Sequence, residues 1–250
     1  MIVLKSADEI ERMRRAGHVT AQTVERLMES VRPGMTTADL DALAEESIRS
    51  EGCTPSFKGY RGFPASICTS VNDQVVHGIP SPRVLREGDL ISLDVGAVWD
   101  GYHGDSAVTV FVGSPPSDVA EKLVRVTEDS LEAAISQIRV GARLSDVGHA
   151  VQQVVEGAGF SVVREYVGHG IGRALHEDPQ IPNYGDPGRG PVMNRGLVIA
   201  VEPMVNAGDW RTRVLADRWT VVTADGSLSA HFEHTIAVTD EGVDVLTARG

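Results

Sequence analysis

The segment Gly88-Asp-Leu-Ile-Ser-Leu-Asp94 has a counterpart 108 residues later, in Gly196-Leu-Val-Ile-Ala-Val-Glu202. Each copy is an apolar run that ends in an acidic residue, and short apolar runs of this kind are typical of buried strands. Two further pairs of segments match in the same order: 32–40 (RPGMTTADL) with 139–147 (RVGARLSDV), and 103–110 (HGDSAVTV) with 231–238 (HFEHTIAV). Three matches in one order predict an internal duplication, with halves of approximately 1–112 and 113–250.

Each half begins with two predicted helices and continues with strands. A capping box at Ser6–Glu9 starts the first helix, Pro33-Gly34 ends it, and a second helix runs from Thr37 to Gly52. The predicted helices of the other half cover 117–138 and 145–157, and Gly159 ends the last one as Gly52 ends its counterpart. Strands are expected within 54–112, 197–205, 219–224 and 231–239, and a surface loop over 177–195. The repeated order predicts an α/β (α+β) fold.

Composition narrows the class of protein. The chain has 250 residues, 42% of them hydrophobic, and no low-complexity segment or linker divides residues 1–250, so we expect a single domain. A net charge of −12 argues against nucleic acid or an anionic membrane as the main partner. Two cysteines form no disulfide framework and favour the cytoplasm. No signal peptide and no membrane span are expected.

The duplication pairs four acidic residues. Asp94 corresponds to Glu202, and Asp105 corresponds to Glu233, and all four lie within or beside apolar strands. One such residue alone is better explained by a salt bridge or a solvent-facing position. Four in equivalent positions favour a shared cation site, because an uncompensated buried charge is costly and four carboxylates balance two divalent ions.

A hairpin accounts for the proximity of two of these acids. A two-residue turn at Trp99-Asp100 would place Asp94 directly opposite Asp105, and one at Asp100-Gly101 would make them diagonal neighbours. Both alternatives put the two carboxylates on one face of the sheet, at a spacing that suits two adjacent metal ions.

Three histidines lie in loop-like segments. Gly168 and Gly170 flank His169, which allows a ligand to approach the backbone closely, and His77 and His176 lie in comparable segments. Each segment could equally be a tight turn. We expect the remaining histidines at the surface or in supporting positions: His18 and His149 in helices, and His103, His231 and His234 beside the proposed ligands.

Taken together, these motifs resemble one family over nearly the whole chain, the type I methionine aminopeptidases of the pita-bread fold. The most specific segments are 60–64 (YRGFP), 67–80 (ICTSVNDQVVHGIP), 93–96 (LDVG), 104–105 (GD), 168–177 (GHGIGRALHE), 201–204 (VEPM) and 229–235 (SAHFEHT). The resemblance implies a central, mostly antiparallel curved sheet between two helix–helix–strand halves.

The resemblance also implies a role for each matching residue. Five of them match metal ligands, with Asp105 and Glu233 bridging: Asp94, Asp105, His169, Glu202 and Glu233. His77 matches a histidine that contacts the scissile peptide nitrogen, His176 one that stabilises the tetrahedral intermediate, and Glu202 also the residue that transfers the proton. The implied substrate contacts are Phe57, Tyr60, Phe63, Cys68, His77, Leu175, His176 and Trp219. Leu175 stands where the family has an aromatic residue, and His231 where glutamine is common.

The implied activity is removal of the N-terminal methionine from nascent proteins and peptides with a small second residue. A metal-activated hydroxide would attack the first carbonyl, and the cofactor would be two divalent ions, either Co, Mn, Fe or Zn. We expect a monomeric cytoplasmic enzyme that meets its substrates at the ribosome. Two alternatives stay open: an Xaa-Pro aminopeptidase or prolidase, and a non-catalytic polypeptide-binding protein of the same fold.

Overall fold

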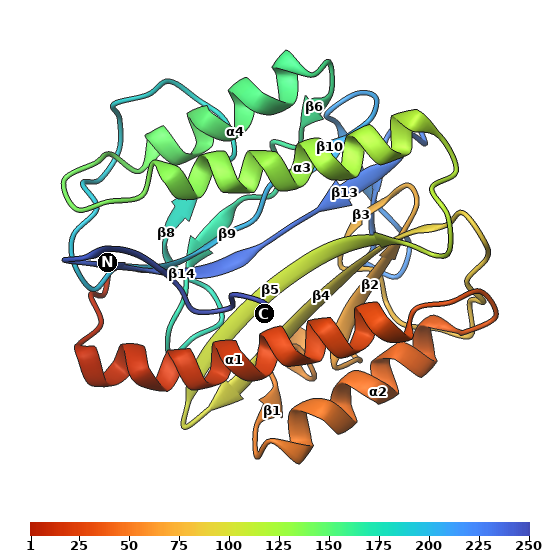
Figure 1. The fold of residues 1–250 in the computed structure, drawn as a ribbon, viewed down its shortest axis with the longest axis horizontal. Coiled ribbons are helices and arrows are strands. Elements are labelled where there is room, and N and C mark those ends of the chain that lie inside the picture. Colours follow the sequence, from red (N-terminus) through yellow and green to blue (C-terminus); the bar gives the residue numbers. More distant parts are fainter.

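Two helix pairs flank the strands in the computed structural model, which describes residues 1–250 (Figure 1). One pair is α1 (Ala7–Ser30) and α2 (Thr37–Ser50), and the other is α3 (Asp118–Ser136) and α4 (Ser145–Gly157). The predicted capping box is confirmed, because Glu9 N–H donates to Ser6 Oγ and Ser6 N–H donates to the Glu9 carboxylate. Gly52 and Gly159 follow α2 and α4 with φ of 73° and 87°, as helix-ending glycines do.

A long hairpin dominates the first sheet. It joins β4 (Leu90–Trp99) to β5 (Tyr102–Phe111), and β1 (Thr54–Pro55) and β2 (Ile67–Val71) also pair with β4. The turn residues Asp100 and Gly101 have φ of 48° and 77°, the left-handed backbone conformation that both central residues of a type I′ hairpin turn adopt. Of the two predicted turns, the structure therefore has Asp100-Gly101.

The second large sheet has the order β15-β14-β9-β7-β8, and two three-stranded sheets complete the fold. Its strands are β7 (Gly168–Gly170), β8 (Glu177–Ile181), β9 (Val198–Val201), β14 (His234–Thr239) and β15 (Gly242–Val245). The small sheets contain β3 (Gln74–Val76), β11 (Thr212–Val214) and β12 (Val221–Thr223), and β6 (Ser161–Val162), β10 (Met204–Asn206) and β13 (Ser229–His231). The strand pairs are antiparallel.

Three sequence predictions need correction. The first five residues of the expected loop 177–195 form β8, which pairs with β7 across a register shift. The expected strand 197–205 is broken after Val201, because Pro203 has no N–H for a ladder. The expected strand 231–239 is likewise divided between β13 and β14, with Glu233 at the break.

Hydrogen bonds join β5 to the segment around Glu233. Ala107 N–H donates to the Glu233 carbonyl at 3.3 Å, and Glu233 N–H donates to the Ala107 carbonyl at 3.0 Å. Thr235 Oγ1 accepts from Asp105 N–H at 2.9 Å and donates to the Asp105 carbonyl at 2.8 Å. Two acidic residues that are 128 positions apart in the sequence are thereby fixed side by side.

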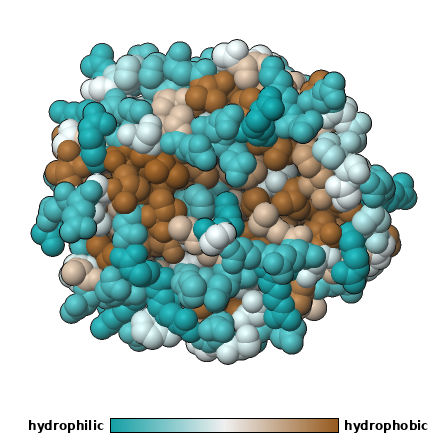
Figure 2. All heavy atoms as spheres, viewed as in Figure 1, coloured by the Kyte–Doolittle hydropathy of each residue, from teal (hydrophilic) through white to brown (hydrophobic).

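Backbone packs directly against backbone where α1 crosses β5. A Cβ placed on Gly104 would lie 2.7 Å from Gly17 N and 2.9 Å from the Ala16 carbonyl carbon, so only glycine fits. Thr20 Oγ1 donates to the Gly104 carbonyl at 3.2 Å in the same contact. Figure 2 shows the same side of the molecule, with hydrophilic residues along both helix margins and hydrophobic residues between them. None of the helices has the length and apolar character needed to cross a bilayer.

Candidate metal centre

A cavity of about 140 Å³ gathers the residues that the sequence singled out. Its walls are formed by Phe57, Tyr60, Arg61, Phe63, Cys68, His77, Asp94, Asp105, His169, Leu175, His176, Glu202, Trp219 and Glu233. Every residue that was matched to a metal ligand or a substrate contact lies among them, although their roles remain predictions. Arg61 is the one lining residue that the sequence reasoning missed.

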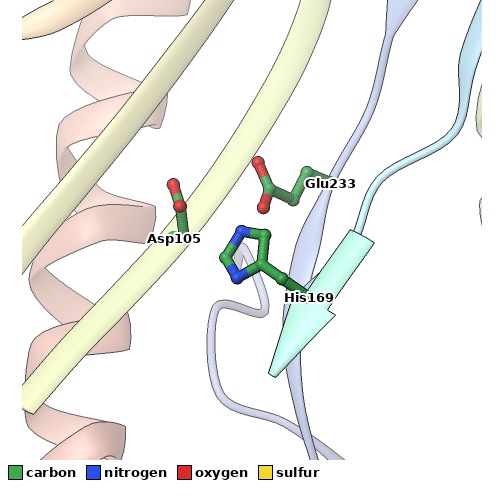
Figure 3. A group of neighbouring side chains, drawn as sticks. All are labelled: Asp105, His169 and Glu233. Atoms are coloured by element: carbon green, nitrogen blue, oxygen red, sulfur yellow. The ribbon is translucent and has the colours of Figure 1, made fainter. Parts of the chain in front are cut away.

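Three of the residues that line the cavity are potential ligands that lie close together (Figure 3). Asp105 projects from β5, His169 from β7 and Glu233 from the break between β13 and β14, and all three are buried. One ligand atom from each lies within 4.8 Å of the other two. Three different segments of the chain therefore present a carboxylate, an imidazole and a carboxylate to one small volume.

Two more acidic residues complete the cluster. Asp94 on β4 pairs with Ala107 while Asp105 pairs with Gly96, so the two aspartates are diagonal neighbours on one face of the hairpin. Glu202 directly follows β9, and its Oε1 lies 3.4 Å from His169 Nε2. The strand break at Glu202-Pro203 therefore falls at a residue that faces the cavity.

Burial strongly perturbs the carboxyl groups of this cluster. Desolvation raises the pKa of Asp94 to about 7. Desolvation, followed by repulsion from neighbouring acids, raises the pKa values of Asp105, Glu202 and Glu233 well above their usual range. Like charges and low polarity both disfavour ionisation, so without a cation the cluster retains protons near neutral pH.

The cluster fits divalent cations. The buried Oδ1 atoms of Asp94 and Asp105 have no hydrogen-bond partner, and no lysine or arginine pairs with any of the four acids. Unpaired buried carboxylate oxygens are costly, and a cation is the partner that would satisfy them. Carboxylate oxygens with one imidazole form the donor set of Mn, Fe, Co and Zn sites.

The imidazole of His169 is oriented for ligation. Its Nδ1–H donates to the Gly170 carbonyl at 3.0 Å, which leaves the lone pair on Nε2, the atom that faces Glu202. Burial lowers the pKa of His169 to about 3, so the ring is neutral. A neutral imidazole whose second nitrogen is held by a carbonyl is the usual arrangement of a metal-bound histidine.

Two further histidines lie at the cavity beside the cluster. The ring of His176 is 4.2 Å from that of His169, and Nδ1 of His176 is hydrogen-bonded to Tyr60 Oη at 2.9 Å. Partial burial and then the nearby Arg61 charge lower the pKa of His176. His77 has a positive φ of 59°, and desolvation lowers its pKa to about 4. Both rings are therefore neutral hydrogen-bonding groups near pH 7.

Apolar side chains also line the cavity. Phe63 and Trp219 meet edge to face at 5.1 Å, and Phe57, Cys68 and Leu175 are buried beside the same space. Aromatic, thiol and leucine side chains together suit a long unbranched apolar side chain.

The other histidines occupy supporting positions. Nδ1 of His103 is hydrogen-bonded to Ser56 Oγ at 2.9 Å, and that of His234 to Thr247 Oγ1 at 2.9 Å. His18 is exposed as expected. His149 is half-buried rather than on the surface, because its Nδ1–H donates to the Gly185 carbonyl at 3.0 Å. His231 is buried and has no hydrogen bond through its ring.

Arg61, which the sequence reasoning missed, stacks on a residue that it had found, Tyr60. It is exposed, its φ is 49°, and its guanidinium lies over the Tyr60 ring at 5.3 Å. Its position between Tyr60 and Phe63 in the sequence could have drawn attention to it, but nothing in the sequence indicates the left-handed backbone that turns it to the cavity rim.

A buried carboxylate cluster with an oriented imidazole, open to an apolar pocket, is typical of a metal-dependent hydrolase. Comparison with known proteins agrees, because residues 11–240 match the family described as metallopeptidase family M24. The chain is 55% identical over 247 residues to methionine aminopeptidase 1 of Bacillus subtilis, with 99% of each chain covered. The chain belongs to metallopeptidase family M24 and, within it, to the methionine aminopeptidases.

Solved structures place the fold in the same group. A methionine aminopeptidase from Thermotoga maritima has a TM-score of 0.98 and 50% identity, and the match covers 100% of both chains. Prolidase from Pyrococcus furiosus shares the fold, with a TM-score of 0.82 at 21% identity, and the match covers 99% of this chain and 66% of that one. The expected pita-bread fold is thus confirmed.

Proposed function

We propose that this chain is a methionine aminopeptidase that removes the N-terminal methionine from peptides and nascent proteins with a small second residue. The observation that carries the proposal is one cavity in which an apolar wall adjoins a cluster of four carboxyl groups and three histidines. The wall suits a methionine side chain, and the cluster suits hydrolysis of the adjacent peptide bond. An identity of 55% to a methionine aminopeptidase over nearly the full length supports the same assignment.

We further propose two divalent ions per chain, drawn from Co, Mn, Fe and Zn. Asp94, Asp105, His169, Glu202 and Glu233 would hold them, with Asp105 and Glu233 as the shared ligands, and the proximity of these side chains supports this ligand set. When bound, such ions lower the pKa of water and polarise a carbonyl oxygen. Asp105 and Glu233 are fixed by the hydrogen bonds between β5 and the Glu233 segment, so their spacing is set by the fold.

Side chains of the protein carry out the proton transfer and the hydrogen bonding to the substrate. Glu202 follows β9 directly and lines the cavity, so its carboxylate would accept a proton from the attacking water and return it to the leaving nitrogen. When Tyr60 Oη donates to Nδ1 of His176, the ring proton lies on Nε2, and Nε2–H would then donate to the developing oxyanion. His77 would contact the nitrogen of the scissile peptide bond.

Selectivity follows from the shape of the pocket. Phe63 and Trp219 provide aromatic edges, which make favourable contacts with thioether sulfur, and a β-branched side chain would fill the narrow space less well. We propose that the enzyme is a cytoplasmic monomer and that nascent chains leaving the ribosome are its physiological substrates.

A peptide assay tests the proposal. Metal-depleted protein is reloaded with Co, Mn, Fe or Zn ions separately and given peptides beginning Met-Ala, Met-Pro and Ala-Pro. We expect release of methionine from the Met-Ala peptide with at least one ion and no turnover without metal. Turnover of only the proline peptides would indicate an Xaa-Pro aminopeptidase or prolidase, and binding of methionyl peptides without cleavage would indicate a non-catalytic binding protein.

A further inference from the structure

His231 is a buried histidine next to the carboxylate cluster that the proposed mechanism does not use. It ends β13, is paired with Met204 on β10, and is 2% exposed. Neither Nδ1 nor Nε2 has a hydrogen-bond partner. A buried polar ring with two unsatisfied nitrogens is unfavourable, so its presence calls for a partner.

The backbone of His231 is held firmly against the hairpin. Thr109 Oγ1 on β5 accepts from His231 N–H at 2.8 Å and donates to the His231 carbonyl at 2.8 Å. Ser92 Oγ on β4 is hydrogen-bonded to the same Thr109 hydroxyl at 2.8 Å. These contacts fix the position of His231 relative to the two strands that carry Asp94 and Asp105.

The ring faces two potential metal ligands from a distance that one water molecule spans. Nε2 lies 3.9 Å from Glu202 Oε2 and 4.0 Å from Glu233 Oε2. Both separations are too long for direct hydrogen bonds, whereas a bridging water can lie within hydrogen-bond distance of all three atoms. Such a water would accept from the imidazole N–H and donate to both carboxylates, which uses its two hydrogens fully.

We propose that His231 is a positioning residue of the metal centre, which holds Glu202 and Glu233 in their ligating orientation through a shared water. The proposal rests on the proposed function, because it requires these two residues to bind a cation. Through the water, its Nε2–H constrains Oε2 of both carboxylates, whereas Oε1 of Glu202, which lies 3.4 Å from His169 Nε2, remains available to the ion. Groups that orient metal ligands in this way commonly affect metal affinity by 10- to 100-fold.

Metal binding provides a direct test without peptide. Metal-depleted wild-type protein, His231→Leu and His231→Gln are titrated with MnCl₂ in a calorimeter. Leucine has a similar size but no polar atom, whereas the glutamine amide retains a donor. We expect His231→Leu to bind Mn²⁺ about 10- to 100-fold more weakly than wild type and His231→Gln to stay within about threefold of it.

The outcomes separate this proposal from the proposed function. Equal Mn²⁺ affinities of wild type and His231→Leu would overturn the role of His231 and leave the metal centre intact. Absence of Mn²⁺ binding by wild type would overturn the metal centre, and the role of His231 with it. Loss of affinity in His231→Gln as large as in His231→Leu would also count against a hydrogen-bonding role.

A second measurement uses only wild-type protein, in case the buried substitution prevents folding. Histidine labelled with nitrogen-15 is observed by NMR before and after addition of Zn²⁺. We expect the His231 Nε2–H proton to become slowly exchanging and hydrogen-bonded in the Zn²⁺ form. An unchanged His231 signal, or loss of that proton through direct ligation of Zn²⁺, would overturn the proposal.

Discussion

Asp105 is the residue on which most of the centre depends, because it adjoins Asp94 on the hairpin and Glu233 across the chain. We predict that Asp105→Asn lowers methionine release by more than about 100-fold, since the loss of a ligand should exceed the effect of a supporting group. The amide is close in size and uncharged, so the fold is retained. Peptide hydrolysis with saturating Mn²⁺ and circular dichroism test both parts, and hydrolysis at the wild-type rate would remove the bridging role.

Tyr60 contributes through His176. Its hydroxyl is hydrogen-bonded to His176 Nδ1 at 2.9 Å, and when the hydroxyl donates, Nδ1 is the acceptor and the single proton of the neutral ring stays on Nε2. We predict that Tyr60→Phe lowers kcat about tenfold, the equivalent of about 1.4 kcal/mol, with a smaller change in KM. Steady-state kinetics on a Met-Ala peptide measure kcat and KM separately. A change confined to KM would mean that Tyr60 acts only as a wall of the pocket.

At this scale the sequence predicts which residues meet but not how their atoms are oriented. Acidic residues in apolar strands are unusual enough to be noticed, and the duplication pairs them. The tautomer of His169 depends on the carbonyl of its own neighbour, and that of His176 depends on Tyr60, which is distant in the sequence. Such hydrogen bonds follow from tertiary geometry and leave no pattern in the chain.

Gly104 allows α1 to pack directly against the backbone of β5, the strand that carries Asp105. We predict that Gly104→Ala destabilises the protein by about 1–3 kcal/mol, because the new methyl group would overlap the backbone of α1. Methionine release should also fall, since residue 104 adjoins Asp105. Urea unfolding and the peptide assay measure the two effects.

Gly157→Ala is the matched control for this contact. Gly157 is the last residue of α4, and a Cβ there would have no atom within 4 Å. Alanine in a helix is favoured over glycine by about 0.5–1 kcal/mol, so stability should stay equal or rise. Equal losses of stability in both variants would show that the Gly104 effect does not come from the contact with α1.

Secondary structure was predictable where periodicity and turn chemistry coincide. All four helices were expected, and a capping box, Pro33-Gly34, Gly52 and Gly159 marked several of their boundaries. The hairpin was expected with two alternative turns, between which the backbone of Asp100 and Gly101 decides. The strand β8 was missed because its prolines and acidic residues are typical of loops. Its pairing with β7 is a tertiary effect that outweighs local propensity.

The whole molecule should be sensitive to pH when metal is removed. In the unfolded chain the four acids are ionised at neutral pH, whereas burial raises their folded pKa values to about 7 for Asp94 and well above the usual range for the others. The folded state therefore binds more protons, and its stability falls as pH rises through the folded values. Above about pH 7 the histidines are largely neutral in both states and do not offset this loss.

We therefore predict that the Tm of EDTA-treated protein falls as the pH rises above about 7. Mn²⁺ should raise Tm and remove most of this fall, because a cation that binds only the folded state stabilises it and compensates the charges. Asp105→Asn, which removes one charge from the cluster, should weaken the fall in the metal-free protein. Calorimetric melts measure these differences, and identical pH profiles with and without Mn²⁺ would contradict the prediction.

The predicted duplication remains a prediction at the scale of the molecule, but the expected convergence of distant acids has a structural explanation. Glu202 and Glu233 both lie at breaks in strands, and each break turns a carboxylate toward the cavity. A sequence window shows an apolar run with one acid in it. Only the pairing of Glu233 with Ala107 shows that the acid interrupts the strand and joins it to the other half.

The two-residue turn at Asp100-Gly101 has a consequence for how this gene can change. Side chains alternate along a strand, so losing or gaining one codon in the turn would shift β5 by one register position and point Asp105 toward the opposite face. Natural selection should therefore eliminate single-codon insertions and deletions there, while tolerating substitution of the exposed Asp100 by asparagine or glycine, which adopt its φ of 48° readily. A deep mutational library that includes insertions and deletions at the turn would reveal this contrast.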